Sequence, residues 1–276
     1  MQCNNLSQNS ENTIMLIKAK SLKGNTLECI DGEIGKVIEF YFDDQHWTIR
    51  YLVAGTGSWL TGRQVLISPY ALGFPIISDH HLSVNLTKKQ IENSPSLDTD
   101  KPVSRQFEMD YSDYYGWPLY WGGPYMWGAY PNLVLDSSQW KTHQDKVKAW
   151  DPHLCSTDAV RGHHVHAADG NIGHVEDFII DSENWSIRYL DVDTHNWWPG
   201  KRVLISPQWI NCVSWDEETV FVNLHRDTIQ QAPEFNGDIP ITRDYEERLH
   251  AHYQRNGYWI DSSQQSKFDT AYANCP

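Results

Sequence analysis

Short runs of hydrophobic residues, many of them β-branched or aromatic, recur along the chain and predict a protein built mainly of strands. The expected strands of the first half, each bounded by turn-forming residues, cover 27–30, 37–42, 47–54, 64–67 and 82–86. Ser68 before Pro69 predicts a single helical turn, and Thr87 with Gln90 predicts a capping box for a short helix that ends near Asn93. Closely spaced short strands of this kind favour a small barrel or sandwich.

The chain repeats itself at an offset of 138 residues. Residues 31–54, DGEIGKVIEFYFDDQHWTIRYLVA, match residues 169–192, DGNIGHVEDFIIDSENWSIRYLDV. The same offset aligns VLISP at 65–69 with VLISP at 203–207. The match has no gap and extends well beyond the period of a solenoid repeat, so it predicts a duplicated domain. Two domains with the same surface can use the same patch twice, and we therefore expect the copies to pack about a pseudo-two-fold axis.

The repeat also predicts domain boundaries. We expect barrels at 15–95 and 153–233, followed by tails at 96–152 and 234–276 that each contain a short helix. The first tail continues into a stretch rich in Gly, Pro, Trp and Tyr, which we expect to be irregular and to pack on the barrels. Residues 1–14, rich in Asn, Ser and Gln, are typical of a disordered tail.

Several residues shared by the copies favour structural roles. Trp47 and Trp185 open hydrophobic strands and are expected in the core. Arg50 and its equivalent Arg188 lie within those strands, where we expect each to pair with a buried carboxylate or carbonyl group. Gly35, like its counterpart in the second copy, predicts a bulge or a close backbone approach. On the tail helices, one helical face is expected to clasp the tail to its barrel through the pairs Arg105 with Glu108 and Arg243 with Glu246.

Charge and composition narrow the function classes. The net charge of −14 argues against binding to nucleic acid or to anionic lipid, because both need a basic surface. An aromatic content of 13% is too high for a disordered chain. The absence of a long apolar run predicts no membrane insertion, and residues 1–20 have no apolar signal core, so we expect a cytoplasmic protein. The five cysteines, odd in number and without a C-x-x-C motif, are expected to be reduced thiols.

Three motifs present in both copies, D-G-x-I-G-x-V, W-x-I-R-Y-L and V-L-I-S-P, resemble the PRC-barrel family. That family includes the small barrels of the photosynthetic reaction centre H subunit and of a ribosome-maturation factor. The resemblance implies an all-β fold of two tandem small barrels with short helical tails, and a habit of binding proteins without shared catalytic residues. The chain lacks the H subunit's membrane helix and the maturation factor's additional domain, and is most similar to tandem PRC-barrel proteins of bacteria. Neither specific role is therefore carried over.

Histidines and aspartates that occur only in the second copy form two candidate metal-ligand clusters. The first cluster begins directly after His163 and consists of His164, His166 and His174. The second lies at the end of a long strand and consists of Asp191, Asp193 and His195. Alternate residues of a strand share a face, which brings the members of each cluster together. Imidazoles would suit zinc or nickel, and the carboxylates widen the choice to manganese or iron. The alternative for both clusters is a solvated polar face.

No sequence motif of an enzyme is present. A nucleophile elbow, a Walker loop and a dinucleotide-binding glycine motif are all absent. The sequence therefore favours a non-enzymatic adaptor or scaffold that binds an unidentified protein partner, without a cofactor, and that can form a homo-oligomer. The alternative is a metal-dependent hydrolase or a metal-binding protein whose transition-metal site lies in the second barrel.

Overall fold

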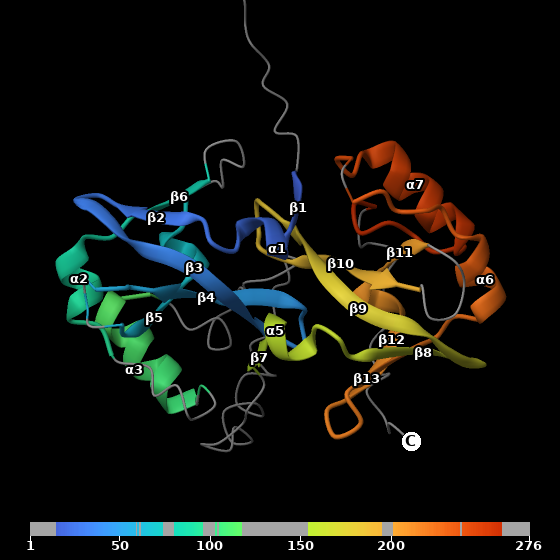
Figure 1. The fold of residues 1–276 in the computed structure, drawn as a ribbon, viewed down its shortest axis with the longest axis horizontal. Coiled ribbons are helices and arrows are strands. Elements are labelled where there is room, and N and C mark those ends of the chain that lie inside the picture. Colours follow the sequence, from blue (N-terminus) through green and yellow to red (C-terminus); the bar gives the residue numbers. More distant parts are fainter. Residues whose placement is uncertain are drawn as a thin grey trace, which may run out of the picture.

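The computed structural model describes residues 15–58, 60, 62–73, 80–95, 103, 105–117, 154–194, 201–237 and 239–260. They form two mainly antiparallel sheets that lie beside each other, with α2 and α3 next to the first and α6 and α7 next to the second (Figure 1). Among these residues, no helix has both the length and the apolar character needed to span a bilayer.

The first sheet has the strand order β5-β4-β3-β2-β6. Its strands are β2 (Thr26–Cys29), β3 (Gly32–Asp43), β4 (Thr48–Gly55), β5 (Gln64–Ile67) and β6 (His81–Val84). The helical elements of this half are η1 (Pro69–Ala71), α2 (Lys88–Glu92) and α3 (Arg105–Tyr115). The predicted capping box is confirmed, because Thr87 Oγ1 accepts the Gln90 backbone N–H and the Gln90 side chain reaches back to the Thr87 backbone.

The second sheet has the order β11-β10-β9-β8-β13-β12. Its strands are β8 (His164–Ala167), β9 (Gly170–Asp181), β10 (Ile187–Asp193), β11 (Arg202–Ile205), β12 (Ile210–Ser214) and β13 (Thr219–Val222). The helical elements are η3 (Pro207–Trp209), α6 (Arg226–Gln231) and α7 (Arg243–His252). Apart from β12, the described elements of the two halves follow one another in the same order. Within the described residues, strand pairing closes neither sheet into a barrel.

The first strand of each half lies in the sheet of the other half. β1 (Leu16–Lys18) pairs antiparallel with β9, whereas β7 (Leu154–Ser156) pairs antiparallel with β3. Short helices follow both strands, α1 (Ala19–Leu22) after β1 and α5 (Thr157–Val160) after β7. The segments predicted as separate barrels therefore exchange their first strands. Local sequence cannot reveal this exchange, because a strand edge accepts any suitable strand that tertiary structure brings to it.

The two predicted core tryptophans are confirmed, and they help to join the halves. Trp47 and Trp185 are each 5% exposed. Trp47 stacks on Phe42 at 5.4 Å between ring centroids, and Trp185 of the second half lies 6.3 Å from Phe40 of the first. Phe42 also contacts Phe178 across the halves at 5.6 Å. One continuous hydrophobic cluster consequently includes residues of both sheets.

Gly35 and Gly173 occupy the close backbone approaches that the sequence predicts. Their φ angles are +140° and +147°. A Cβ atom on Gly35 would lie 2.0 Å from the Gly55 carbonyl oxygen, and one on Gly173 would lie 1.9 Å from the Asp193 carbonyl oxygen. Only glycine fits where backbone of a neighbouring strand comes so near.

The expectation of reduced thiols is wrong at Cys212. Cys29 and Cys155 are free, but Cys212 on β12 is disulfide-bonded. An odd cysteine count does not exclude a single disulfide, and its two members can be brought together by folding over any sequence distance.

Candidate functional site

Three predicted metal ligands lie in one row across the second sheet. His164 on β8 is the register partner of His174 on β9, which in turn is the register partner of Asp193 on β10. His164 is exposed, whereas His174 and Asp193 are half-buried. The sheet therefore brings one member of the Asp191-Asp193-His195 cluster beside the histidine cluster, a juxtaposition that the sequence did not predict.

His166 lies apart from this row. A β-bulge between Val165 and His166 shifts the register, so that His166 pairs with Asn171. Its Nδ1 lies 2.8 Å from the Ala167 carbonyl oxygen, and its ring lies 5.6 Å from that of Phe221. Because a carbonyl can only accept, Nδ1 carries the proton and donates this bond.

Asp191 is buried and forms an ion pair with Arg202 of β11. The Nε of Arg202 donates to Oδ1 at 2.9 Å, and its Nη2 donates to Oδ2. Burial raises the pKa of Asp191 to about 6, although the Arg202 charge and hydrogen bonds act against this rise. A metal ion would have to displace the guanidinium, so Asp191 is held as a structural carboxylate.

His195 lies outside the described residues. Among those that the structure describes, no three side chains of His, Cys, Asp or Glu are placed so that they could hold a metal ion. A site that includes His195 therefore stays a prediction.

A buried cluster that sequence reasoning missed joins β10 to the tail helix α7. The Tyr189 hydroxyl lies 2.8 Å from Glu246 Oε1 and 3.0 Å from His250 Nε2. His250 Nδ1 lies 3.0 Å from the carbonyl oxygen of Asn256. All three side chains are buried. The only signal in the sequence was that Tyr189 lies in the repeated I-R-Y-L motif and that Glu246 faces the barrel.

Proton positions in this cluster follow from its hydrogen bonds. The Asn256 carbonyl requires a proton on His250 Nδ1, so Nε2 of the neutral ring carries none. The Tyr189 hydroxyl donates its one proton to Glu246 Oε1, and its oxygen lies 3.0 Å from His250 Nε2. Burial raises the pKa of Glu246, although the Tyr189 hydrogen bond and the Arg243 charge act against this rise, and burial lowers the pKa of His250 to about 4.

Cationic side chains close the cluster. Arg243 Nη1 lies 2.9 Å from Glu246 Oε2, as the predicted clasp requires, and its guanidinium lies 4.2 Å from the centre of the Trp259 ring. Arg188 lies 3.9 Å from the centre of the Tyr258 ring. Tyr189, Glu246 and His250 are buried, and their contacts hold the tail helix against the sheet.

The first half fastens its tail differently. Tyr111 on α3 donates its hydroxyl proton to the Leu66 carbonyl at 2.7 Å and accepts the Ser68 backbone N–H at 3.2 Å. Glu108 is buried, as the clasp predicts, while the side chain of Arg105 lies outside the described part of the chain. Both copies thus hold their tail helix against the sheet through different hydrogen bonds, and the Arg105–Glu108 pair stays a prediction.

The predicted buried arginine pairs are confirmed in both halves. Arg188 donates to Asp181 Oδ2 from Nε at 2.9 Å and from Nη2 at 2.6 Å. Arg50 Nη2 donates to Asp43 Oδ2 at 3.2 Å. Burial alone would raise the pKa of Asp43, but the hydrogen bond from His46 and the Arg50 charge hold it below its usual range.

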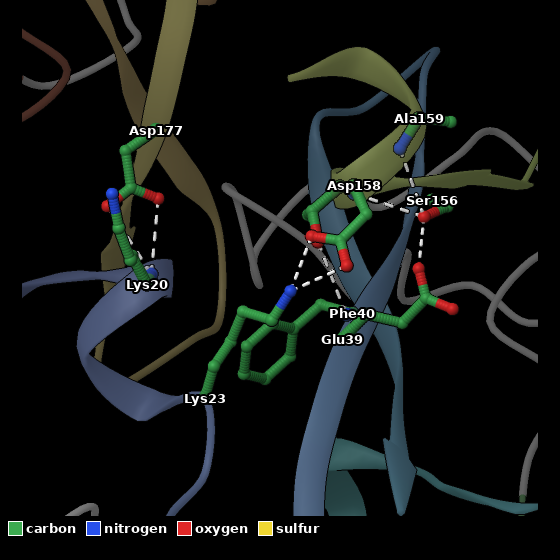
Figure 2. Close-up of polar contacts among 9 residues, drawn as sticks. Lys20, Lys23, Glu39, Phe40, Ser156, Asp158, Ala159 and Asp177 are labelled. Carbon is green, nitrogen blue, oxygen red and sulfur yellow. Dashed lines mark hydrogen bonds and ion pairs between the residues drawn. The ribbon is translucent and has the colours of Figure 1, made fainter. Parts of the chain in front are cut away.

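Polar contacts also join the exchanged segments to the opposite half (Figure 2). The Lys20 backbone N–H donates to Asp177 Oδ1 at 3.1 Å, and the Ser156 hydroxyl donates to Glu39. Glu39 and Asp177 occupy equivalent positions of the repeat. Lys23 Nζ contacts Asp158 Oδ1 and Oδ2 at 2.6 and 2.5 Å, which connects the two exchanged segments to each other.

Many of the buried polar groups among the described residues thus serve the tail contacts, the arginine pairs or the junction between the halves. Comparison with known proteins assigns neither half: no family model matches the chain, and no curated protein matches it.

Proposed function

We propose that the protein is a non-enzymatic adaptor or scaffold that binds other proteins through surfaces held in a fixed relation. The observation that carries the proposal is the reciprocal exchange of β1 and β7 between the sheets. Each half is completed by a strand of the other, and the hydrophobic cluster is continuous between them. The two halves therefore share strands and a hydrophobic cluster, and they present two related but unequal surfaces.

The distribution of polar chemistry supports binding over catalysis. Three carboxylates with shifted pKa values, Asp43, Asp191 and Glu246, each face an arginine, and each is buried. Groups of this kind perturb one another's pKa values in structural networks as well as in active sites. Here every such pair holds strands or a tail helix together.

The finer description of the fold is part of the same proposal. The repeated motifs favour two PRC-type barrels, each completed by the strand that the other donates. A bacterial, cytoplasmic origin is the corresponding proposal for location. The disulfide of Cys212 is more typical of an oxidising compartment than of the reducing cytoplasm. Counting free thiols in protein alkylated during cell lysis distinguishes the two locations.

The test begins with affinity capture by the full chain, followed by purification of the captured protein and measurement of the complex by calorimetry. We expect a complex of defined stoichiometry from the two purified components alone. The proposal fails if no purified protein binds while the chain turns over a hydrolase substrate in a metal-dependent reaction. Loss of that turnover in a His164→Ala/His174→Ala variant would establish the alternative, metal-dependent function.

A further inference from the structure

The hairpin between β12 and β13 presents an unusual combination of exposed side chains. Trp215 at its tip is 41% exposed, and the three acidic residues that follow, Asp216, Glu217 and Glu218, are all exposed. At the equivalent positions, 77–80, the first copy has the sequence Ile-Ser-Asp-His. The second copy therefore differs from the first by a tryptophan and by two additional carboxylates.

Beneath this tip lies a polar group that lacks a partner. His163 is 6% exposed, and its ring stands edge-on to Trp215 with 5.9 Å between centroids. Its Nε2 is buried and has no hydrogen-bond partner. A buried imidazole with an unpartnered nitrogen therefore lies against the exposed indole.

In the first half, the side chains equivalent to His163 and Glu218 contact each other. There Asn25 and His80 replace His163 and Glu218, and the Asn25 Oδ1 lies 3.4 Å from the His80 Nδ1. Glu218 and His80 also share an unusual backbone, with φ angles of 49° and 51°. The backbone conformation at this position is thus shared by the two copies, whereas the side chains differ: a closed polar pair in the first half, and an open acidic and aromatic surface in the second.

We infer that this hairpin tip is the docking surface for an arginine-bearing segment of a protein partner. An indole face attracts a guanidinium group more strongly than other aromatic rings do, and the guanidinium fork matches the geometry of carboxylates. The net charge of −14 attracts a cationic segment from a distance and gives it a high rate of encounter. The inference rests on the proposed adaptor function and names the chemistry of its partner.

The test measures fluorescence anisotropy of a short, end-blocked, labelled peptide that alternates Arg and Gly, added to the full chain. We expect saturable binding that weakens with added salt, and no binding of the matching Glu-Gly peptide. Trp215→Ala should weaken binding by roughly threefold to thirtyfold, the range of a cation–π contact. Neutralising the tip with Asp216→Asn, Glu217→Gln and Glu218→Gln should weaken it further and flatten the salt dependence.

Matched controls are available in the first half. Met109 is 42% exposed, close to Trp215, and Met109→Ala should bind the peptide as the unchanged protein does. Neutralising three exposed carboxylates there, Glu33, Glu92 and Asp113, removes the same charge and should leave binding almost unchanged. Equal loss in the two charge variants would show non-specific attraction and overturn the inference.

Two further outcomes also overturn it. If Trp215→Ala dissolves a self-associated form of the protein while the arginine peptide never binds, the occupant is a second copy of this chain. If a purified partner binds the full chain equally well with and without Trp215, the adaptor function stands and only the docking surface is refuted. Absence of any protein complex refutes the adaptor function itself.

Discussion

Thr48 and Ser186 face each other in an antiparallel bridge between the two sheets. They occupy equivalent positions of the sequence repeat. On either side of the bridge, the Ile49 N–H donates to the Trp185 carbonyl at 2.9 Å and the Ile187 N–H donates to the Trp47 carbonyl at 2.7 Å. This reciprocity, like that of the exchanged strands, is the pattern of a two-fold relation whose axis passes between Thr48 and Ser186.

The exchange predicts that both halves unfold together. Ile17 of β1 is buried and is the register partner of Ile180 in the second sheet. Ile17→Ala should lower the free energy of unfolding by about 2–4 kcal/mol. We expect one denaturant transition, with its midpoint at a lower denaturant concentration. Far-ultraviolet circular dichroism and tryptophan fluorescence should report the same midpoint. The neighbouring Met15 is exposed, and Met15→Ala should leave the midpoint unchanged. Two separate transitions would contradict the interlocked arrangement.

Removing a core tryptophan should be more damaging than removing an exposed one. Trp47→Ala and Trp185→Ala should each cost about 3–5 kcal/mol, because each ring fills space between the sheets. Trp215→Ala is the matched control and should change the unfolding free energy by no more than about 0.5 kcal/mol. Chemical denaturation of the three variants measures the difference. Equal stabilities would place all three rings at the surface.

The buried pair of Asp181 and Arg188 predicts a large cost for removing one partner alone. Arg188→Met should destabilise the protein by about 3–5 kcal/mol, since it leaves the Asp181 carboxylate buried without its guanidinium. Adding Asp181→Asn to this variant should restore part of the loss, because the remaining buried group is then neutral. A double variant that is less stable than Arg188→Met would refute this account.

The burial of Glu246 and His250 beside Tyr189 predicts a pH dependence of stability. The raised pKa of Glu246 means that its contribution is greatest at low pH and is lost as pH rises through the folded-state pKa. His250 acts in the opposite sense: with its pKa lowered from 6.5 to about 4, the unfolded chain binds its proton more tightly, so stability falls as pH decreases through that window.

Glu246→Gln separates these two contributions. A glutamine amide oxygen can still accept from the Tyr189 hydroxyl but the side chain does not titrate, so the His250 contribution alone should remain. Melting temperature should then rise more steeply with pH between about 4 and 6.5 than in the unchanged protein. His250→Gln should instead remove the rise over the same interval. Identical profiles for all three proteins would show that neither group is coupled to folding.

The sequence by itself determined the local elements of this protein. The capping box at Thr87, the close approach at Gly35 and the core positions of Trp47 and Trp185 follow from side-chain chemistry and backbone sterics within a few residues. The repeat doubled the glycine and tryptophan predictions but not the capping box, because the residue equivalent to Thr87 is His225, whose side chain does not cap the helix. The buried carboxylate partner of Arg188 was predicted in kind, although not by name.

Only the tertiary structure decided which distant groups meet. β1 pairs with β9 of the other half, Arg202 forms an ion pair with the Asp191 carboxylate, and His250 contacts Tyr189 from a separate helix. Each of these contacts depends on how the strand edges and helix faces are placed in space. A pattern of hydrophobic and polar residues fixes which face of an element is buried, but not which of several compatible edges or charges will be opposite it.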